Sequence, residues 1–382
     1  MEEIKQEQAV AARPSSAVRA ISGSQQVVRA VFNWKSAVMI AASLVLFIVA
    51  LEFTRGGARS LSFLLKELLI RQNPIHTLGL GWIASYLMLS GSPVAATALT
   101  FLDSGALNEV QTFTMVVGTR FGAIFVTVFF GLLYYWEGTH SKKSLAMGVL
   151  AYWATFWVAL GSLLLGLVLL QVGRFEFGLP IMFAKGLDDF LKPLVKPVID
   201  AVGRVALAGL NVGPGLIFLI GLGLLMLSFK IVDKALPDWR KQEIDHQKFV
   251  DLLHSPFTMF LLGFAITLIS PSVTVSCGLL VPLYAKGYIQ ASRLVPYVMG
   301  ANISTFSDTL LAALVLQNNG AVHVVMTEII SISLVSLAIL IFGFSKFENM
   351  IERWTDYFTE STQRLALFLL IVFFVPLALL IL

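Results

Sequence analysis

The sequence predicts an all-α polytopic membrane protein with two inverted repeats, each holding a re-entrant helical hairpin and a broken transmembrane helix. Three observations predict this fold. Of the 382 residues, 57% are hydrophobic and only 13% are charged, whereas soluble domains have about a quarter charged residues. Several apolar runs approach the roughly 20 residues that a helix needs to cross a bilayer. Other apolar runs are interrupted by small polar residues, and these interruptions recur in the same order in both halves of the chain.

The uninterrupted apolar runs are the clearest predicted spans. They are Ser36–Phe53, Leu145–Val172, Pro214–Phe229, Ala321–Phe344 and Leu365–Leu382. Two amphipathic stretches, Arg59–Gln72 and Phe175–Ala206, have the pattern of helices that lie along a membrane surface. The predicted organisation is a polar N-terminal tail, a first membrane repeat, an amphipathic interfacial linker and a second membrane repeat with an extra C-terminal helix, over residues 1–35, 36–172, 173–212 and 213–382.

The two re-entrant hairpins are predicted where an apolar run meets a cluster of hydroxyl residues. In the first half, Ile75–Leu89 runs into Ser90–Pro93, and a short apolar piece leads to a turn at Asp103–Gly105. In the second half, Pro256–Ile269 runs into the cluster Ser270–Thr274. Each apolar piece is too short to span by itself, so a hairpin that enters and leaves on one side is expected.

Each hairpin is followed by a polar cluster that contains a glycine. The first is "VVGTRFGAIF", Val116–Phe125, and the second is "VMGANISTFSDT", Val298–Thr309. We interpret both as breaks in a helix, with Gly118 and Gly300 opening a further helix in each half. Glycine at these positions allows either a close approach of two backbones or a positive φ angle.

Paired breaks of this kind have a physical meaning. Backbone leaves the helical form at membrane depth only where it is buried in protein or lines a wet cavity. Broken segments at corresponding positions of two halves indicate the binding site of a transporter. The N-termini of half-helices suit an anion, and the oxygens of Ser, Thr and Asn suit a small cation such as Na⁺. The simpler alternative is that small residues let helices pack closely.

At these motifs the sequence resembles the type II sodium/phosphate cotransporter family. "GANIST", Gly300–Thr305, is similar to a Gly-Ala-Asn-Ile-Gly-Thr segment of that family, and "GTRFGA", Gly118–Ala123, is a weaker match in the first half. "SGS", Ser90–Ser92, and "SVT", Ser272–Thr274, lie where the family has three hairpin serines. The resemblance covers roughly residues 75–136 and 256–316.

The resemblance implies sodium-coupled symport of inorganic phosphate or a similar small anion through a site formed by the two hairpins. From the resemblance and from the chemistry of the side chains, the predicted substrate-binding residues are Ser90, Ser92, Thr119, Arg120, Ser272, Thr274, Asn302, Ser304 and Thr305. Ion coupling is assigned to Asp308, Ser276 and Thr309, with a Na⁺ site at Ser272, Thr274, Asn302 and Asp308. Na⁺ is the expected coupling ion, and no organic cofactor is expected.

The sequence also departs from that family. The hairpin glutamines are absent, and Leu89 and Pro271 stand at their positions. The asparagine of the first repeat is replaced by Arg120. A guanidinium at bilayer depth is costly unless it is paired or hydrated, and it can bind an oxyanion with two parallel hydrogen bonds. Arg120 is therefore predicted to contact substrate, to pair with Asp308, or to lie near the membrane interface.

Other functions receive less support from the sequence. The net charge of +4 suits anionic lipid headgroups rather than nucleic acid. No metal motif, nucleophile–base spacing or glycine-rich phosphate loop is present, so we expect no enzymatic activity. The alternatives are a proton-coupled or other-anion transporter of the same fold, with Asp308 as the proton carrier, and a non-transporting membrane subunit. We expect a multi-pass protein of the cell (inner) membrane, and leave open whether it is a homo-oligomer.

Overall fold

The computed structural model describes residues 34–69, 73–134, 142–172, 197, 214–235, 255–269, 276–277, 280, 284 and 289–382. The described residues are almost entirely helical, and no strand occurs among them. Within these described ranges, six helical segments are long and apolar enough to cross a membrane: Trp34–Ala58, Glu109–Phe129, Leu145–Val172, Ala291–Leu316, Asn319–Thr359 and Thr362–Ile381. The all-helical class is thus confirmed, and the six segments indicate an integral membrane protein. The predicted tail up to residue 33, and the linker over 173–212 except residue 197, lie outside the described residues.

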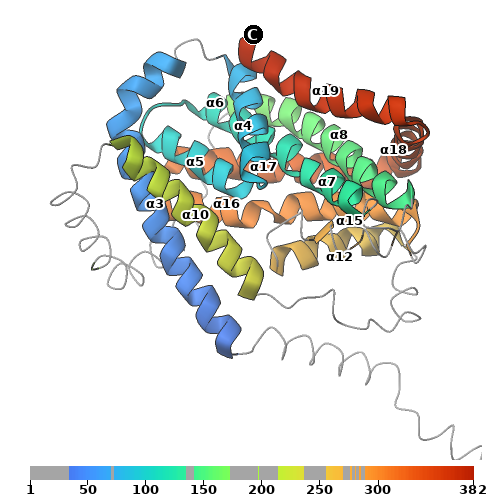
Figure 1. Ribbon diagram of the computed structural model, residues 1–382, viewed down its shortest axis with the longest axis horizontal. Coiled ribbons are helices and arrows are strands. Elements are labelled where there is room, and N and C mark those ends of the chain that lie inside the picture. The colour runs from blue at the N-terminus through green and yellow to red at the C-terminus, as the bar shows by residue number, and fades with distance from the viewer. Residues whose placement is uncertain are drawn as a thin grey trace, which may run out of the picture.

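The described residues of the first half form the helices that begin the chain of elements in Figure 1. They are α3 (Trp34–Leu69), α4 (Pro74–Met88), α5 (Ser92–Asp103), α6 (Glu109–Ala123), α7 (Phe125–Tyr134) and α8 (Lys142–Val172). Local sequence fixes several ends. Asn73 caps α4, because its side-chain oxygen accepts a hydrogen bond of 2.8 Å from the backbone nitrogen of His76. Asn108 and Gln111 form a reciprocal capping box at the beginning of α6, which satisfies two backbone donors that the helix leaves unpaired.

The described part of the second half is also helical. It includes α10 (Pro214–Ala235), α12 (Pro256–Ile269), α15 (Ala291–Ser304), α16 (Phe306–Leu316) and α17 (Asn319–Ala338). A π-helical turn, η3 (Ile339–Gly343), then joins α17 to α18 (Phe344–Thr359), and α19 (Thr362–Ile381) ends the chain. α19 lies over α4, where the Tyr86 hydroxyl donates to the carbonyl oxygen of Val372 at 2.9 Å.

Glycines bring one pair of helices into backbone contact in each half. In the first half, α4 packs on α6 so closely that a Cβ at Gly118 would collide with the carbonyl oxygen of Leu78. In the second half, α12 packs on α15, and a Cβ at Gly300 would collide with the carbonyl oxygen of Phe260. Each residue of the second contact lies 182 positions after its counterpart in the first. Both glycines therefore serve close packing, and neither has a positive φ angle.

The helix breaks lie later than the sequence predicts. Gly118 and Gly300 lie inside α6 and α15 rather than at the beginning of a helix. The chain leaves helical form at Ile124, between α6 and α7, and at Thr305, between α15 and α16. The expectation that the glycines open new helices is therefore wrong. The glycines are needed inside the helix because the neighbouring helix passes directly over them.

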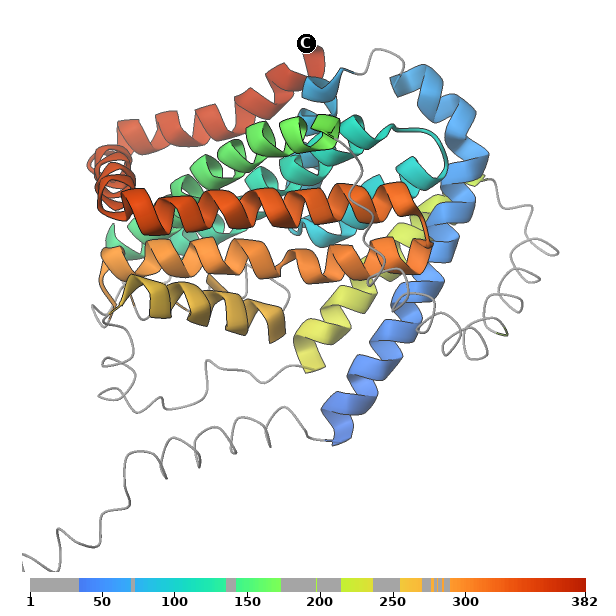
Figure 2. The ribbon, with the colours of Figure 1, turned by 180° about the vertical axis from the view of Figure 1, so that it is seen from behind.

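The first helix also differs from expectation. α3 continues without a break from Trp34 to Leu69, although the sequence predicts a separate interfacial helix from Arg59. α3 and α10 lie side by side and cross the other helices obliquely (Figures 1 and 2). Their contact is partly polar, since Ser43 and Ser228 each donate a side-chain hydrogen bond to the other's carbonyl oxygen, at 2.8 and 2.9 Å.

The C-terminal end of α5 is tied to two other helices. Asp103, at the end of α5, accepts hydrogen bonds from Arg55 on α3 at 2.6 and 3.1 Å. It also accepts one from the side-chain nitrogen of Asn318 at 3.1 Å. Asn318 in turn caps α17 by accepting a hydrogen bond from the backbone nitrogen of Ala321. We call this set of contacts the Arg55–Asp103–Asn318 joint.

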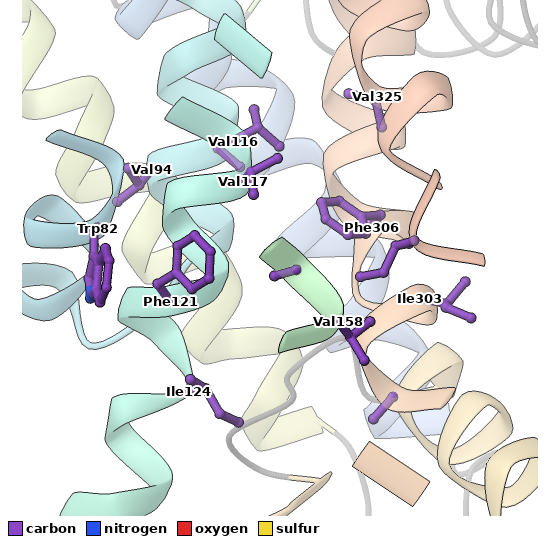
Figure 3. Close-up of a cluster of buried hydrophobic side chains, with 14 of the residues drawn as sticks. Trp82, Val94, Val116, Val117, Phe121, Ile124, Val158, Ile303, Phe306 and Val325 are labelled. Atoms are coloured by element: carbon purple, nitrogen blue, oxygen red, sulfur yellow. The ribbon is translucent and has the colours of Figure 1, made fainter. Parts of the chain in front are cut away.

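The two helix breaks lie in one apolar core. Figure 3 shows Phe121 and Ile124 beside the first break, Ile303 and Phe306 beside the second, and Val158 of α8 between them. All five side chains belong to one cluster of buried residues. α8 and α17 pack on each other and both contact α6 and α15, so the breaks are enclosed by protein.

Candidate functional site

Arg120 lies at the centre of the candidate site. It projects from the last turn of α6, with 4% of its surface exposed, and reaches the break of the other half. One terminal guanidinium nitrogen donates a hydrogen bond of 2.5 Å to the hydroxyl of Thr305. The guanidinium carbon lies 4.2 Å from the ring centroid of Phe306, a distance at which an aromatic face attracts a cation. Arg120 thus connects the two breaks.

Two other nitrogens of the Arg120 guanidinium carry further N–H donors. Its Nε and second terminal nitrogen are buried and have no hydrogen-bond partner among the described residues. No carboxylate of the described residues lies within ion-pair distance of it. The alternative of a direct ion pair with Asp308 is therefore not found. Asp308 and Glu328 nevertheless lie close enough for their charges to act on Arg120.

Asp308 supplies an unused acceptor in the same region. It lies in the first turn of α16 and is 7% exposed. One carboxylate oxygen accepts a hydrogen bond of 3.0 Å from the Thr309 hydroxyl, whereas the other oxygen is buried without a partner among the described residues. The side chain of Ser92, at the beginning of α5, interacts with this carboxylate. The first hairpin and the second break therefore meet at Asp308.

Asn302 and Thr305 connect the break to α8. The Thr305 hydroxyl donates to the carbonyl oxygen of Asn302 at 3.1 Å. The Asn302 side-chain nitrogen donates to the Thr155 hydroxyl on α8 at 2.9 Å. Asn302 lies at the end of α15 rather than at a helix beginning, and no side chain caps α16. A capping role for these residues is therefore not observed.

The other predicted hydroxyl residues are less closely joined to Arg120. Thr119 and Ser304 are buried, but each donates to a carbonyl oxygen of its own helix, at 2.6 and 3.4 Å. Ser90 lies between α4 and α5 and is partly exposed. Ser276 belongs to a separate hydroxyl cluster, in which it is 2.7 Å from Tyr297 and from Thr267. Ser272 and Thr274 lie outside the described residues.

A second buried carboxylate lies on α17. Glu328 is fully buried, and its carboxylate accepts a hydrogen bond of 2.7 Å from Ser162 on α8. Ser331, one turn further along α17, is 3.4 Å from its other oxygen. Arg120 is the charged group that acts on Glu328 electrostatically. The sequence assigns no role to Glu328, although a single acid in a long apolar run is a signal for a functional residue.

Phe306 and Thr155 are further participants that the sequence analysis missed. Phe306 is one of many phenylalanines and Thr155 one of many threonines in apolar runs, so neither has a local signal. Their roles depend on which helix faces them. Phe306 covers one face of the Arg120 guanidinium, and Thr155 holds the Asn302 side chain.

The arrangement suits the binding of an oxyanion. Arginine binds such a group with two parallel N–H donors, and Arg120 has two nitrogens with unused donors in a buried site. Among the described residues, no group of three or more His, Cys, Asp or Glu side chains is placed to hold a metal ion. In comparisons with protein-family models, curated proteins and solved structures, no match to this chain was found.

Proposed function

We propose that the protein is a secondary active transporter that carries inorganic phosphate, or a similar small anion, in symport with Na⁺ across the cell (inner) membrane. We further propose that it is a divergent relative of the type II sodium/phosphate cotransporters. In this proposal the substrate binds where the two helix breaks meet, and Arg120 is its main ligand.

The observation that carries this proposal is the state of the Arg120 side chain. Its guanidinium is buried and positively charged, and two of its nitrogens lack partners among the described residues. A buried polar group without a hydrogen bond costs about 1–3 kcal/mol, and more when it is charged. A phosphate would accept both missing hydrogen bonds and supply opposite charge. The site is therefore better satisfied with an anion bound than without one.

The matched packing of the two halves supports the proposed inverted repeats. The contacts of Gly118 and Gly300 recur at a separation of 182 residues. Among the described residues, α3, α6–α7 and α8 provide three spans before α10 begins. An odd number of spans reverses the direction of the second half relative to the membrane. This is the arrangement in which transporters place a site between their repeats.

The lengths of the short helices support the proposed re-entrant hairpins. α4 has 15 residues and α5 has 12, whereas a spanning helix needs about 20. Leu89, between them, has a φ angle of 50°, which ends α4 and turns the chain. α12 has only 14 residues and would form the first arm of the second hairpin.

Asp308 supports Na⁺ as the coupling ion. One of its carboxylate oxygens has no hydrogen-bond partner among the described residues, and oxygen is the ligand that Na⁺ takes from proteins at broken helices. The Ser92 side chain and the Thr309 hydroxyl are close to the same carboxylate. A Na⁺ bound here would also balance part of the negative charge that phosphate brings.

Uptake of labelled phosphate into proteoliposomes tests the proposal. We expect purified protein to accumulate phosphate when an inward Na⁺ gradient is imposed, and calorimetry to detect phosphate binding. Arg120→Ala should abolish binding while the protein keeps its unfolding temperature within a few degrees. Arg120→Lys is the matched control, because it keeps the charge and loses the planar fork. Wild-type protein that folds but neither binds nor transports phosphate would refute the proposal and favour a non-transporting subunit.

A further inference from the structure

The contact between α8 and α17 contains a carboxylate that the proposed phosphate site does not use. Glu328 is fully buried on α17, and its described hydrogen-bonding partners are two serine hydroxyls. Ser162 reaches one carboxylate oxygen at 2.7 Å and Ser331 lies 3.4 Å from the other. A carboxylate at membrane depth is costly unless it is neutralised, and such residues mark ion and proton pathways.

The hydrogen bonds around Glu328 can be satisfied in both protonation states. When the carboxylate is ionised, both serine hydroxyls can donate to it. When it is protonated, the Ser331 oxygen can accept a hydrogen bond from the new carboxyl O–H, because the Ser331 hydroxyl can instead donate to the carbonyl oxygen of Glu328 at 3.1 Å. Ser162 keeps its bond to the other oxygen. Hydroxyl groups permit this exchange because each can donate and accept.

The charges near Glu328 favour the binding of a proton by its carboxylate when Asp308 is ionised. The titratable or charged side chains on α17 and on the elements packed against it include Glu109, Arg120, Asp103, Asp308, Tyr152, Arg293, Tyr297 and His323. Of these, only Arg120 acts on Glu328 electrostatically. Arg120 also interacts with Asp308, so one fixed cation faces two carboxylates. When both are ionised, one negative charge remains uncompensated in the core.

We infer that Glu328 is a proton-binding site of the transport cycle, placed between α8 and α17 and separate from the phosphate and Na⁺ ligands. This inference rests on the proposed transport function. Glu328 takes a proton from water when the site opens to one side and releases it to water on the other. No covalent bond other than the O–H bond forms or breaks. Since Glu328 is fully buried here, exchange of this proton requires movement at the α8–α17 contact.

A proton suits this position better than a second metal cation. Na⁺ is bound by several oxygens at once, but the described side chains contacting the carboxylate are only Ser162 and Ser331. A proton needs a single acceptor oxygen, which Glu328 provides.

Infrared difference spectroscopy tests the site independently of transport. We expect wild-type protein to show a C=O band of a buried carboxylic acid that appears as the pH is lowered. The band should be missing in Glu328→Gln and unchanged in Glu348→Gln, a matched change on α18. Ser162→Ala should alter the midpoint of the titration, because the ionised carboxylate loses its shortest hydrogen bond. A band that persists in Glu328→Gln, or that wild type lacks, would overturn the inference.

Uptake without a Na⁺ gradient tests the role in the cycle. At clamped membrane potential, an inward proton gradient of about one pH unit should drive about tenfold phosphate accumulation if one proton moves with each anion. Glu328→Gln should lose this accumulation and retain phosphate affinity within about threefold. Accumulation that remains in Glu328→Gln contradicts the inference. If wild type transports no phosphate at all, the proposed function fails, and the infrared band still decides whether Glu328 binds a proton.

Discussion

The break between α6 and α7 and the break between α15 and α16 have the same packing and different polar side chains. Beside each, a glycine lets a neighbouring helix lie against the backbone, at Gly118 and at Gly300. The first break provides a cation, Arg120, where the second has Asn302, the residue 182 positions later. The second provides a hydroxyl, an aromatic ring and a carboxylate. The comparison teaches that packing can be repeated in two halves while the polar side chains differ between them.

The largest effect on phosphate affinity is expected when the two breaks are given the same polar residue. Arg120→Asn gives the first break the residue of the second. We expect phosphate affinity to fall by about 3 kcal/mol, or about 100-fold, because a buried charge that pairs with the ligand is lost. Calorimetry measures this loss. The matched change Asn302→Ala removes the hydrogen bond to Thr155 and should weaken binding far less. Equal losses in the two variants would contradict the division of ligands between the breaks.

Because the glycine contacts are the same in the two halves, replacing either glycine should lower stability by the same amount. Gly118→Ala and Gly300→Ala each place a Cβ against a carbonyl oxygen of the adjacent helix. We expect each to lower stability by about 2–3 kcal/mol, as overpacked cores do, measured by unfolding in detergent. Gly223→Ala on α10 is the control, since nothing lies within 4 Å of its added Cβ. Loss of stability in only one half would show that the two contacts are not equivalent.

Loss of the Thr305 hydroxyl at the second break should lower stability more than loss of a hydroxyl that bonds within its own helix. Thr305→Ala gives this position the residue of its counterpart, Ala123, and removes the hydrogen bond from Arg120. Hydrogen bonds to charged groups contribute about 1.5–3 kcal/mol, so we expect about 2 kcal/mol lower stability in the same unfolding assay. Thr119→Ala removes a bond to the carbonyl oxygen of Val116 and should cost less. The reverse order would show that Arg120 does not depend on Thr305.

The smallest effect on phosphate affinity is expected when the aromatic ring of Phe306 is replaced. Phe306→Ile gives the second break the residue of its counterpart, Ile124, and removes the ring that faces the Arg120 guanidinium at 4.2 Å. A cation–π contact contributes about 1 kcal/mol, so phosphate affinity should fall about fivefold as Arg120 loses one of its two positional restraints. Unchanged affinity, measured by calorimetry, would mean that Thr305 alone orients the guanidinium.

Elements bounded by local signals could be predicted from the sequence. The apolar run Pro256–Ile269 has the same limits as α12, because a proline begins it and hydroxyl residues follow it. The end of α3 could not be predicted. Its charged second part has an interfacial pattern, yet the helix continues to Leu69, and no proline interrupts it.

Positions that depend on a second helix could not be predicted either. The breaks follow Gly118 and Gly300 by several residues, because the backbones of α4 and α12 pack directly against those glycines. Arg120 and Asp308 were both selected from the sequence. Their partners were not, since the reach of Arg120 to Thr305 depends on how α6 faces the other half. The sequence groups Ser276 with Asp308 as an ion-coupling residue, whereas the Ser276 hydroxyl is hydrogen-bonded to the hydroxyl of Tyr297.

The Arg55–Asp103–Asn318 joint has a consequence for how the molecule can move. It connects α3, the far end of α5 and the beginning of α17 through one carboxylate with 6% of its side-chain surface exposed. Separating Arg55 from Asp103 would remove two hydrogen bonds between charged groups, and hydrogen bonds to charged groups contribute about 1.5–3 kcal/mol each. The joint therefore resists separation of the middle of α3, the end of α5 and the beginning of α17, at the end of α5 that lies opposite to the end beside Asp308.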